Sequence, residues 1–477
     1  MTSYITGLAG TPGPGWFTDN NGQPKLWVAT ETWGLPVNAG EWNGSGGGTF
    51  EQDYDNFFSE RAAQGFTVCM TDPVWAATGS GAASVNGNTW DGVTPLAGGS
   101  HDPSSAGLNA TFWDRIDYML SSAAANGITV GLTVANIGDD VESGQWQDSW
   151  TGTQWEDWGA LVGARYASTP NLVWLAGNDM FSPYSDSILD AVYGGVVGAG
   201  AGQMWSAWYN AECTSRFVTD TAEAEGWGTD YAAFNFCYSY NAGYWIIEYA
   251  YLEVADEDAA SLLPVTWGDG YFYQGGSGDG YDSTYDRALR QEWWWTLASG
   301  SRGVLGEAEN VYPWSASSCP GAVTGNWFFA NNAANIVSAF TSLSGWHKLI
   351  PDTSSALVTA GRGTRVSGLT SGGSGGSYEP AFTNSYVAAS RSPDGTLAVL
   401  YLPAHTTVTI NQSLLVPGYS ATWIDPVSGA RTAATPGSTY NSTAKGTNSQ
   451  GDPDWVLTFQ GAVPAATVPP VYSMRRC

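Results

Sequence analysis

The first 350 residues alternate short apolar runs with longer stretches in which apolar and polar residues recur at helical spacing. Such runs are typical of buried parallel strands, and the stretches between them are long enough for a covering helix. The pattern predicts eight βα units closed into a (β/α)8 TIM barrel, an α/β fold. The eight runs are Leu26–Thr30, Phe66–Met70, Ile128–Val134, Leu172–Ala176, Met204–Tyr209, Tyr231–Cys237, Leu263–Trp267 and Gly303–Gly306.

The stretch after the first run predicts a helix. Thr49 and Gln52 have the spacing of a capping box, and Phe50, Tyr54 and Phe57 share one helical face. The apolar faces of this helix and its successors would cover the outside of the barrel. The other helices are predicted at residues 112–125, 155–167, 244–254 and 285–299.

The composition and the apolar pattern of the sequence change near residue 350. Gly/Ser-rich turns and alternating segments such as TLAVLYLPAHTTVTI follow, which is typical of a small antiparallel β domain. We therefore expect two domains, a barrel at residues 1–350 and a small antiparallel β-sandwich at residues 351–477.

Charge limits the partners that this chain can have. Sixteen basic and 44 acidic residues give a formal net charge of -28, which repels nucleic-acid phosphates and anionic membrane surfaces. No run of some 20 apolar residues is present either. We expect no nucleic-acid partner and no membrane insertion.

The N-terminal segment predicts how the protein reaches its target. It begins with Met and lacks the basic start and apolar run of a secretory signal. The Ala, Gly, Thr and Trp bias, with only three lysines, is typical of genes of high GC content. We expect a tail protein of a phage of actinobacteria, with other virion tail proteins as partners; the alternative is a secreted, extracellular enzyme. A virion protein predicts a homo-oligomer, and a secreted enzyme a monomer.

Cysteine and histidine provide no metal site. The five cysteines are far apart and odd in number, and the three histidines are not paired at ligand spacing. Buried free thiols are expected, with a Cys213–Cys237 bridge as the alternative. Acidic clusters such as 139–142 are more typical of solvated turns than of calcium loops. We expect neither a metal ion nor any other cofactor.

Candidate catalytic and binding residues lie just after the apolar runs, because a barrel places its active site at the carboxyl ends of its strands. Aromatic rings can stack on the CH-rich face of a sugar while acids and amides bind its hydroxyls, and glycoside hydrolysis needs two carboxyl groups. Asp179 and Asp269 are the predicted catalytic pair, with polysaccharide as the substrate. The predicted substrate-binding residues are Glu31, Trp33, Asp72, Trp75, Asn136, Asn178, Tyr240, Tyr271, Glu307, Glu309 and Trp314.

Each of these residues also has a purely structural interpretation. Asp179 can be a loop carboxylate or helix cap, and Asp269 can belong to a tight turn between Gly268 and Gly270. Glu307 and Glu309 compete for the nucleophile's role or bind hydroxyls only. With 25 tryptophans in the chain, many must be core.

Several motifs together resemble the apiosidase-like glycoside hydrolase family. The segments are WFTDNNGQPKLWVATETW, YDNFFSERAAQGFTVC, NLVWLAGNDM, PVTWGDGYFYQG and, in the β domain, WIDPVSGAR, in the family's order. The resemblance implies a barrel with a C-terminal β-sandwich, with Asp179 as general acid/base. The family nucleophile is a Glu where this chain has Asp269, and the shorter side chain puts its competence in doubt.

The predicted function is therefore a glycoside hydrolase-like protein that cleaves or binds cell-surface polysaccharide by a two-carboxylate retaining mechanism, as a phage minor tail protein. A catalytically inactive, glycan-binding tail subunit is one alternative. A secreted bacterial glycosidase is the other.

Overall fold

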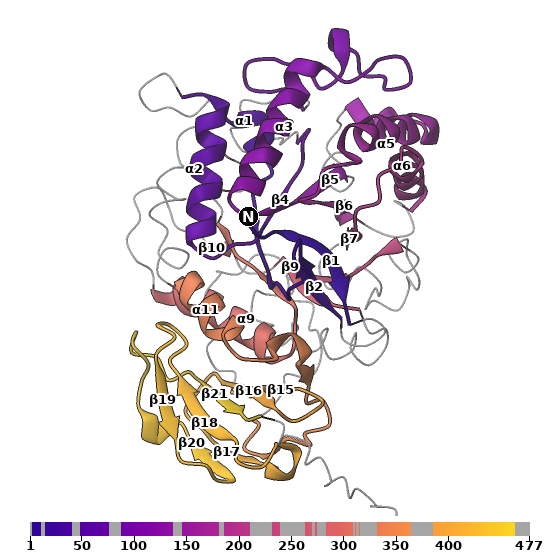
Figure 1. Cartoon of the computed structure of the whole chain (residues 1–477). Coiled ribbons are helices and arrows are strands. Elements are labelled where there is room, and N and C mark those ends of the chain that lie inside the picture. Colours follow the sequence, from indigo (N-terminus) through magenta and orange to yellow (C-terminus); the bar gives the residue numbers. More distant parts are fainter. Residues whose placement is uncertain are drawn as a thin grey trace, which may run out of the picture.

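The computed structural model describes residues 2–10, 15–40, 48–75, 87–136, 146–180, 186–209, 231–238, 263–269, 272–273, 283–308, 311, 314, 332–363 and 385–462. At the ends of several barrel strands it describes the backbone only. The barrel lies at the top in Figure 1, the C-terminal sheets lie below it, and helices α9 (Ser283–Ala298) and α11 (Ala334–Thr341) lie between them.

The predicted barrel is confirmed. Six parallel strands pair in the order β11-β3-β4-β5-β6-β7, and β8 pairs with β9 in parallel. Backbone hydrogen bonds close the circle: Ala233 N donates to Trp205 O (2.8 Å), and Arg302 N donates to Val265 O (2.7 Å). In chain order the strands are β3 (Trp27–Glu31), β4 (Val68–Thr71), β5 (Thr129–Ala135), β6 (Leu172–Met180), β7 (Trp205–Tyr209), β8 (Asn235–Tyr238), β9 (Val265–Asp269) and β11 (Gly303–Leu305).

Helices cover the barrel largely as predicted. The capping box of Thr49 and Gln52 forms at the start of α2. Helix α6 was not predicted; it packs closely on α5, where a Cβ at Gly195 would lie 2.0 Å from Glu156 O. The helix predicted at 244–254 lies outside the described residues. The helices are α1 (Leu35–Asn38), α2 (Phe50–Ala63), α3 (Ala110–Ala125), α5 (Gly152–Tyr166), α6 (Asp186–Gly198), α9 (Ser283–Ala298) and α11 (Ala334–Thr341).

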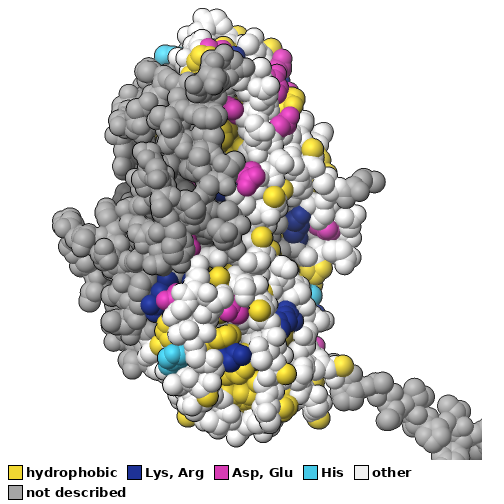
Figure 2. Space-filling view, turned by 90° about the vertical axis from the view of Figure 1, so that its left-hand side faces the viewer, with side chains coloured by type: hydrophobic (Ala, Val, Ile, Leu, Met, Phe, Trp, Pro, Cys, Tyr) yellow, Lys and Arg dark blue, Asp and Glu magenta, His cyan; other side chains and the backbone are white. Residues whose placement is uncertain are grey.

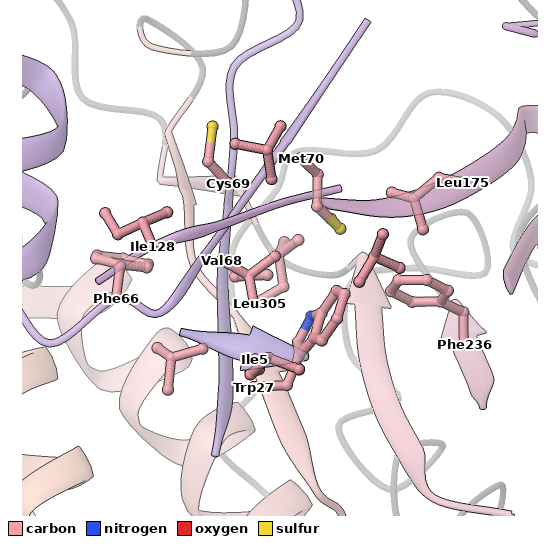
Figure 3. Packing of buried hydrophobic residues seen from close by; sticks show 14 of the residues in the cluster. Ile5, Trp27, Phe66, Val68, Cys69, Met70, Ile128, Leu175, Phe236 and Leu305 are labelled. Carbon is pink, nitrogen blue, oxygen red and sulfur yellow. The ribbon is translucent and has the colours of Figure 1, made fainter. Parts of the chain in front are cut away.

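A β-hairpin that the apolar pattern did not reveal precedes the barrel. Strands β1 (Ile5–Ala9) and β2 (Trp16–Asp19) pair antiparallel. Ile5 is buried, its N–H donates to Thr129 Oγ1 at the start of β5 (2.7 Å), and it lies near Trp27 and Val68 in the core (Figure 3). The hairpin therefore closes the amino end of the barrel and leaves the carboxyl end for a site.

The predicted C-terminal β-sandwich is present as two antiparallel sheets. A six-stranded sheet has the order β13-β15-β16-β21-β18-β19 and a three-stranded sheet the order β14-β17-β20. One face of the larger sheet packs on the barrel's core and the other on the smaller sheet. The strands are β13 (Ile350–Pro351), β14 (Val358–Ala360), β15 (Ala388–Arg391), β16 (Leu397–Leu402), β17 (Thr407–Ile410), β18 (Ser420–Ile424), β19 (Arg431–Ala434), β20 (Thr439–Asn441) and β21 (Trp455–Gln460).

Helix α9 joins the barrel to the sandwich through buried charges. Arg290 is fully buried and donates to Asp454 through Nε (3.0 Å) and through a terminal nitrogen (3.0 Å), and to Asp452 (2.7 Å). Tyr401 (3.0 Å) and Asn448 (2.8 Å) also donate to Asp454. The carboxylate therefore has its hydrogen-bonding capacity satisfied inside the interface.

The run Trp293–Trp295 serves packing, in line with the expectation that many of the tryptophans are core residues. All three rings are buried. Their indole N–H groups donate in turn to the carbonyl oxygens of Leu305 in β11 (2.7 Å), Pro426 (2.9 Å) and Tyr386 (2.9 Å). One helix thus contacts the eighth barrel strand on one side and the sandwich on the other.

His347 at this junction should make stability depend on pH. Its ring lies edge-on to Trp16 at 4.8 Å. Burial, with Lys348 and Arg302 nearby, lowers its pKa from 6.5 to about 4. The unfolded chain binds a proton here near pH 6.5 and the folded chain does not, so stability present above pH 6.5 is lost as the pH falls towards 4. The melting temperature of a His347→Phe variant should fall less than that of the wild type over this interval. Parallel curves would contradict the assignment.

The predictions about cysteines and metal ligands can be compared with the structure only at the described residues. Cys69 in β4 is buried and free, and burial raises the pKa of its thiol. Cys213 and the Cys237 side chain lie outside the described residues, so their pairing stays a prediction. Within the described ranges no three His, Cys, Asp or Glu side chains group as metal ligands, and no helix is long and apolar enough to cross a bilayer.

Candidate active site

Neighbouring strands bring three of the predicted binding residues to the carboxyl edge of the barrel. Glu31 is the last residue of β3, Asp72 follows β4, and Asn136 follows β5. These strands are adjacent and parallel, so their carboxyl ends meet at one edge. Each side chain is at most 2% exposed. The barrel therefore collects two carboxyl groups and one amide in a nearly dry environment.

Glu31 and Trp33 form a fixed pair at this edge. The indole N–H of Trp33 donates to Glu31 Oε2 at 3.2 Å. The Trp33 ring lies 5.4 Å from the ring of Trp208 in β7, and Trp208 stacks at 5.8 Å on Phe236 in β8. This aromatic row runs from the end of the first strand into the barrel core, where Phe236 also contacts Trp27 at 5.8 Å. Trp208 and Phe236 were not predicted as site residues, because inside an apolar strand they are indistinguishable from core.

Asp72 shapes its own turn. Its side chain is fully buried, and Oδ1 accepts the backbone N–H of Val74 at 2.9 Å. Trp75, three residues after Asp72, is 3% exposed. Asp72 thus holds the loop that carries Trp75, which is a structural role that does not exclude contact with a substrate.

Asn136 has an unusual environment. It is 1% exposed, yet neither amide atom has a hydrogen-bond partner among the residues that the structure describes. Buried polar atoms are nearly always paired, since an unpaired one costs roughly 1–3 kcal/mol. At the carboxyl edge of a barrel strand, both atoms of this amide are therefore available for hydrogen bonds to a bound molecule.

Replacing Asn136 with the similarly shaped Leu should separate stability from function. We expect the melting temperature to stay level or rise, because an unpaired amide is removed, and kcat/KM to fall at least about tenfold, because substrate hydroxyls lose their partner. Thr133→Val is the matched control: its hydroxyl, in the strand that Asn136 follows, is also buried and without a partner in the described part of the chain. If the two variants have equal kcat/KM, Asn136 does not bind the substrate.

The two predicted catalytic residues follow irregularities in their strands. In β6 the pairing with β7 shifts between Ala176 and Met180, and Gly177 adopts φ 76°. In β9 the pairing with β8 shifts so that Tyr238 faces Asp269, and a Cβ at Gly268 would lie 2.3 Å from the Phe236 ring. Such bulges redirect side chains at barrel rims.

The backbone places Asp179 and Asp269 on strands rather than in a helix cap or a free turn. Asp179 is in β6 and Asp269 is the last residue of β9. Beyond β9, the short strand β10 (Phe272–Tyr273) pairs in parallel with β12 (Glu307–Ala308), and Phe272 faces Glu307. The ends of the seventh and eighth barrel strands therefore lie side by side.

The remaining predicted residues cannot be assigned contacts. The side chains of Asn178, Asp179, Asp269 and Glu307 lie outside the described part, as do Tyr240, Tyr271 and Glu309 altogether. The separation of the two catalytic carboxyl groups stays a prediction.

Trp314 is described, and its backbone is strained. It has φ 46°, a conformation that is rare for a bulky residue, and it is 3% exposed with its ring edge-on to Phe57 of α2 at 5.4 Å. Residue 311, three positions earlier, accepts a hydrogen bond from Thr32 Oγ1 at 3.3 Å. Strain of this kind collects at functional sites, and a role for Trp314 in stacking on a sugar stays a prediction.

Among the solved structures that resemble this fold over nearly the whole chain, two have TM-scores near 0.7. A protein described as a glycoside hydrolase has a TM-score of 0.70 at 14% identity, covering 97% of this chain and 97% of its own. A family 5 glycoside hydrolase from Bacteroides vulgatus ATCC 8482 has a TM-score of 0.68 at 16% identity, covering 96% and 95%. The fold is that of a glycoside hydrolase barrel with a C-terminal β domain.

Sequence comparison narrows this class to one family. The model of the apiosidase-like catalytic domain matches residues 14–348, which is more than half of the chain. The protein therefore belongs to the apiosidase-like family, as its motifs suggested. No curated protein matches its sequence.

Proposed function

We propose that this protein is a retaining glycoside hydrolase that cleaves cell-surface polysaccharide, with Asp179 as general acid/base and Asp269 as nucleophile. The observation that carries the proposal is the pair of strand irregularities, at Gly177 and Gly268, directly ahead of these residues. The family match supports the reaction class.

The reaction would run in two steps. The Asp179 carboxyl group protonates the glycosidic oxygen while the Asp269 carboxylate attacks the anomeric carbon; the glycosidic C–O bond breaks and the aglycone leaves as an alcohol. Asp179, now ionised, then takes a proton from water, whose oxygen displaces Asp269 from the glycosyl ester. The two carboxyl groups would need to lie about 5–5.5 Å apart.

The buried residues at the strand ends suit substrate binding in this scheme. Asn136 offers a donor and an acceptor without partners in the described part of the chain, and Glu31 and Trp33 provide a fixed carboxylate and ring. In Figure 2 acidic side chains are scattered over the barrel half, and basic ones form no strip on the described part of that face. A polymer rich in hydroxyl groups fits this surface better than a polyanion.

A tail protein of a phage of actinobacteria is the biological setting that we propose, with other tail proteins as partners. The second candidate function is glycan binding without hydrolysis. One observation favours it: Asp269 stands where the family has the longer Glu, and a misplacement of about 1 Å can cost on the order of a hundredfold in rate.

The test is hydrolysis of aryl arabinofuranosides and apiofuranosides, arabinan and purified actinobacterial wall polysaccharides, with the first-formed anomer identified by proton NMR. Cleavage with retention is the expected result. Inversion would overturn the mechanism. Binding of a polysaccharide without cleavage would leave the glycan-binding subunit as the function, and neither cleavage nor binding would overturn both.

A further inference from the structure

Trp90 differs from the other tryptophans whose side chains the structure describes. It is 40% exposed, and it alone among them is an exposed residue. It lies between β4 and α3, in the loop that leaves the carboxyl end of the second barrel strand. That is the end of the barrel at which Asp72 and Trp75 are found.

The exposed ring is held in place rather than loose. The Trp90 indole N–H donates to Ala39 O (2.9 Å), and its backbone N–H donates to Val37 O (3.0 Å). The next peptide is fixed as well, because Gly40 N–H donates to Asp53 Oδ2 at 2.7 Å. The exposed indole is therefore already ordered, so little conformational entropy is lost when a partner binds to it.

Fixed polar groups adjoin the ring in sequence. Asp91 accepts both terminal nitrogens of Arg115, at 2.9 and 2.7 Å, and the Thr89 hydroxyl at 2.6 Å. The Asp91 side chain remains 33% exposed. An apolar ring next to an ordered carboxylate with lone pairs in solvent is the combination that binds a sugar, whose CH face stacks while its hydroxyls donate.

The ring lies a short distance from the candidate active site. Ala39 follows helix α1, and α1 begins at Leu35, two residues after Trp33. Four helical residues rise roughly 6 Å, and the Trp90 indole is hydrogen-bonded to Ala39 at the end of this helix that lies away from Trp33. Helix α1 lies in Figure 1 at the upper end of the barrel, near α2 and α3.

We infer that Trp90 and Asp91 form an outer sugar-binding subsite, which holds a ring of the polysaccharide beyond the ring whose bond is cleaved. The inference rests on the proposed function and deepens it, because it makes an extended glycan rather than a small glycoside the preferred substrate.

The test compares full-length wild type with Trp90→Ala and Trp90→Phe. In affinity gels containing arabinan or wall polysaccharide, Trp90→Ala should bind roughly 3- to 10-fold more weakly, while Trp90→Phe keeps most of the affinity. Hydrolysis of aryl furanosides, which end at the cleaved bond, should be unchanged. Tyr231→Ala is the matched control: this ring is 37% exposed but precedes β8, at the opposite end of the barrel.

The outcomes separate this inference from the proposed function. Unchanged polysaccharide binding in Trp90→Ala, or an equal loss on aryl furanosides, would overturn the subsite and leave the hydrolase standing. A wild type that binds polysaccharide but cleaves nothing would overturn the hydrolase, and the affinity gels would still decide the subsite. If the wild type neither binds nor cleaves any polysaccharide, both fail.

Discussion

Asp179→Asn should lower kcat/KM on polysaccharide by roughly 10²- to 10⁴-fold, the usual contribution of a general acid. The loss should be much smaller on aryl furanosides with acidic leaving groups, because a stable phenolate departs without a proton. The alkaline limb of the pH–rate profile reports the ionisation of the general acid, so the variant should lack this limb. Steady-state kinetics on both substrate types measures this difference.

Asp269→Asn should behave differently, with activity reduced on the order of 10⁴-fold or more on both substrate types, since no leaving group compensates for a missing nucleophile. Glu307→Gln is the control, because Glu307 lies in the neighbouring strand β12. A moderate loss is expected there. If Glu307→Gln abolishes turnover and Asp269→Asn does not, the nucleophile is Glu307 and the assignment from motif position is wrong.

Asp454→Ala should lower the free energy of unfolding by about 3–5 kcal/mol, because it leaves the guanidinium of Arg290 buried without its main partner. Both side chains are fully buried, and two hydrogen bonds of 3.0 Å join them. Chemical denaturation followed by tryptophan fluorescence measures the change. Asp452→Ala should cost less, because the Asp452 side chain is 22% exposed.

A double variant, Arg290→Met with Asp454→Leu, tests the physical cause. Removing both charges should restore much of the lost stability, since an apolar pair needs no compensating partner. If the double variant is as unstable as Asp454→Ala, then shape at the interface matters more than charge. Activity is a second measurement, because α9 also contacts β11 through Trp293.

The barrel strands could be predicted from the sequence because parallel strands buried on both faces must be continuously apolar. All eight predicted runs became barrel strands. Capping at Thr49 was equally local, since the spacing of Thr49 and Gln52 alone determines it. The alternating pattern was less informative in the sandwich: β16 is buried throughout, because one face of its sheet packs on the barrel and the other on the second sheet.

Local pattern could not separate α6 from irregular chain. Its glycines look like helix breakers, but at Gly195 the close approach of α5 leaves no room for a side chain, because a Cβ there would lie 2.0 Å from Glu156 O. The hairpin of β1 and β2 was missed for a related reason: Ile5 lies in a short segment without a clear pattern, and its backbone N–H hydrogen-bonds to Thr129, 124 residues away in sequence.

For the candidate site, the sequence by itself determined which residue types follow each strand, and therefore that acids, amides and tryptophans collect at one end of the barrel. Only the tertiary structure decided which of them are fixed, buried or exposed. Trp33 is 4% exposed and Trp90 is 40% exposed, although both follow barrel strands. Burial, unpaired amides and strand irregularities arise from contacts between segments far apart in the chain, and no local pattern contains them.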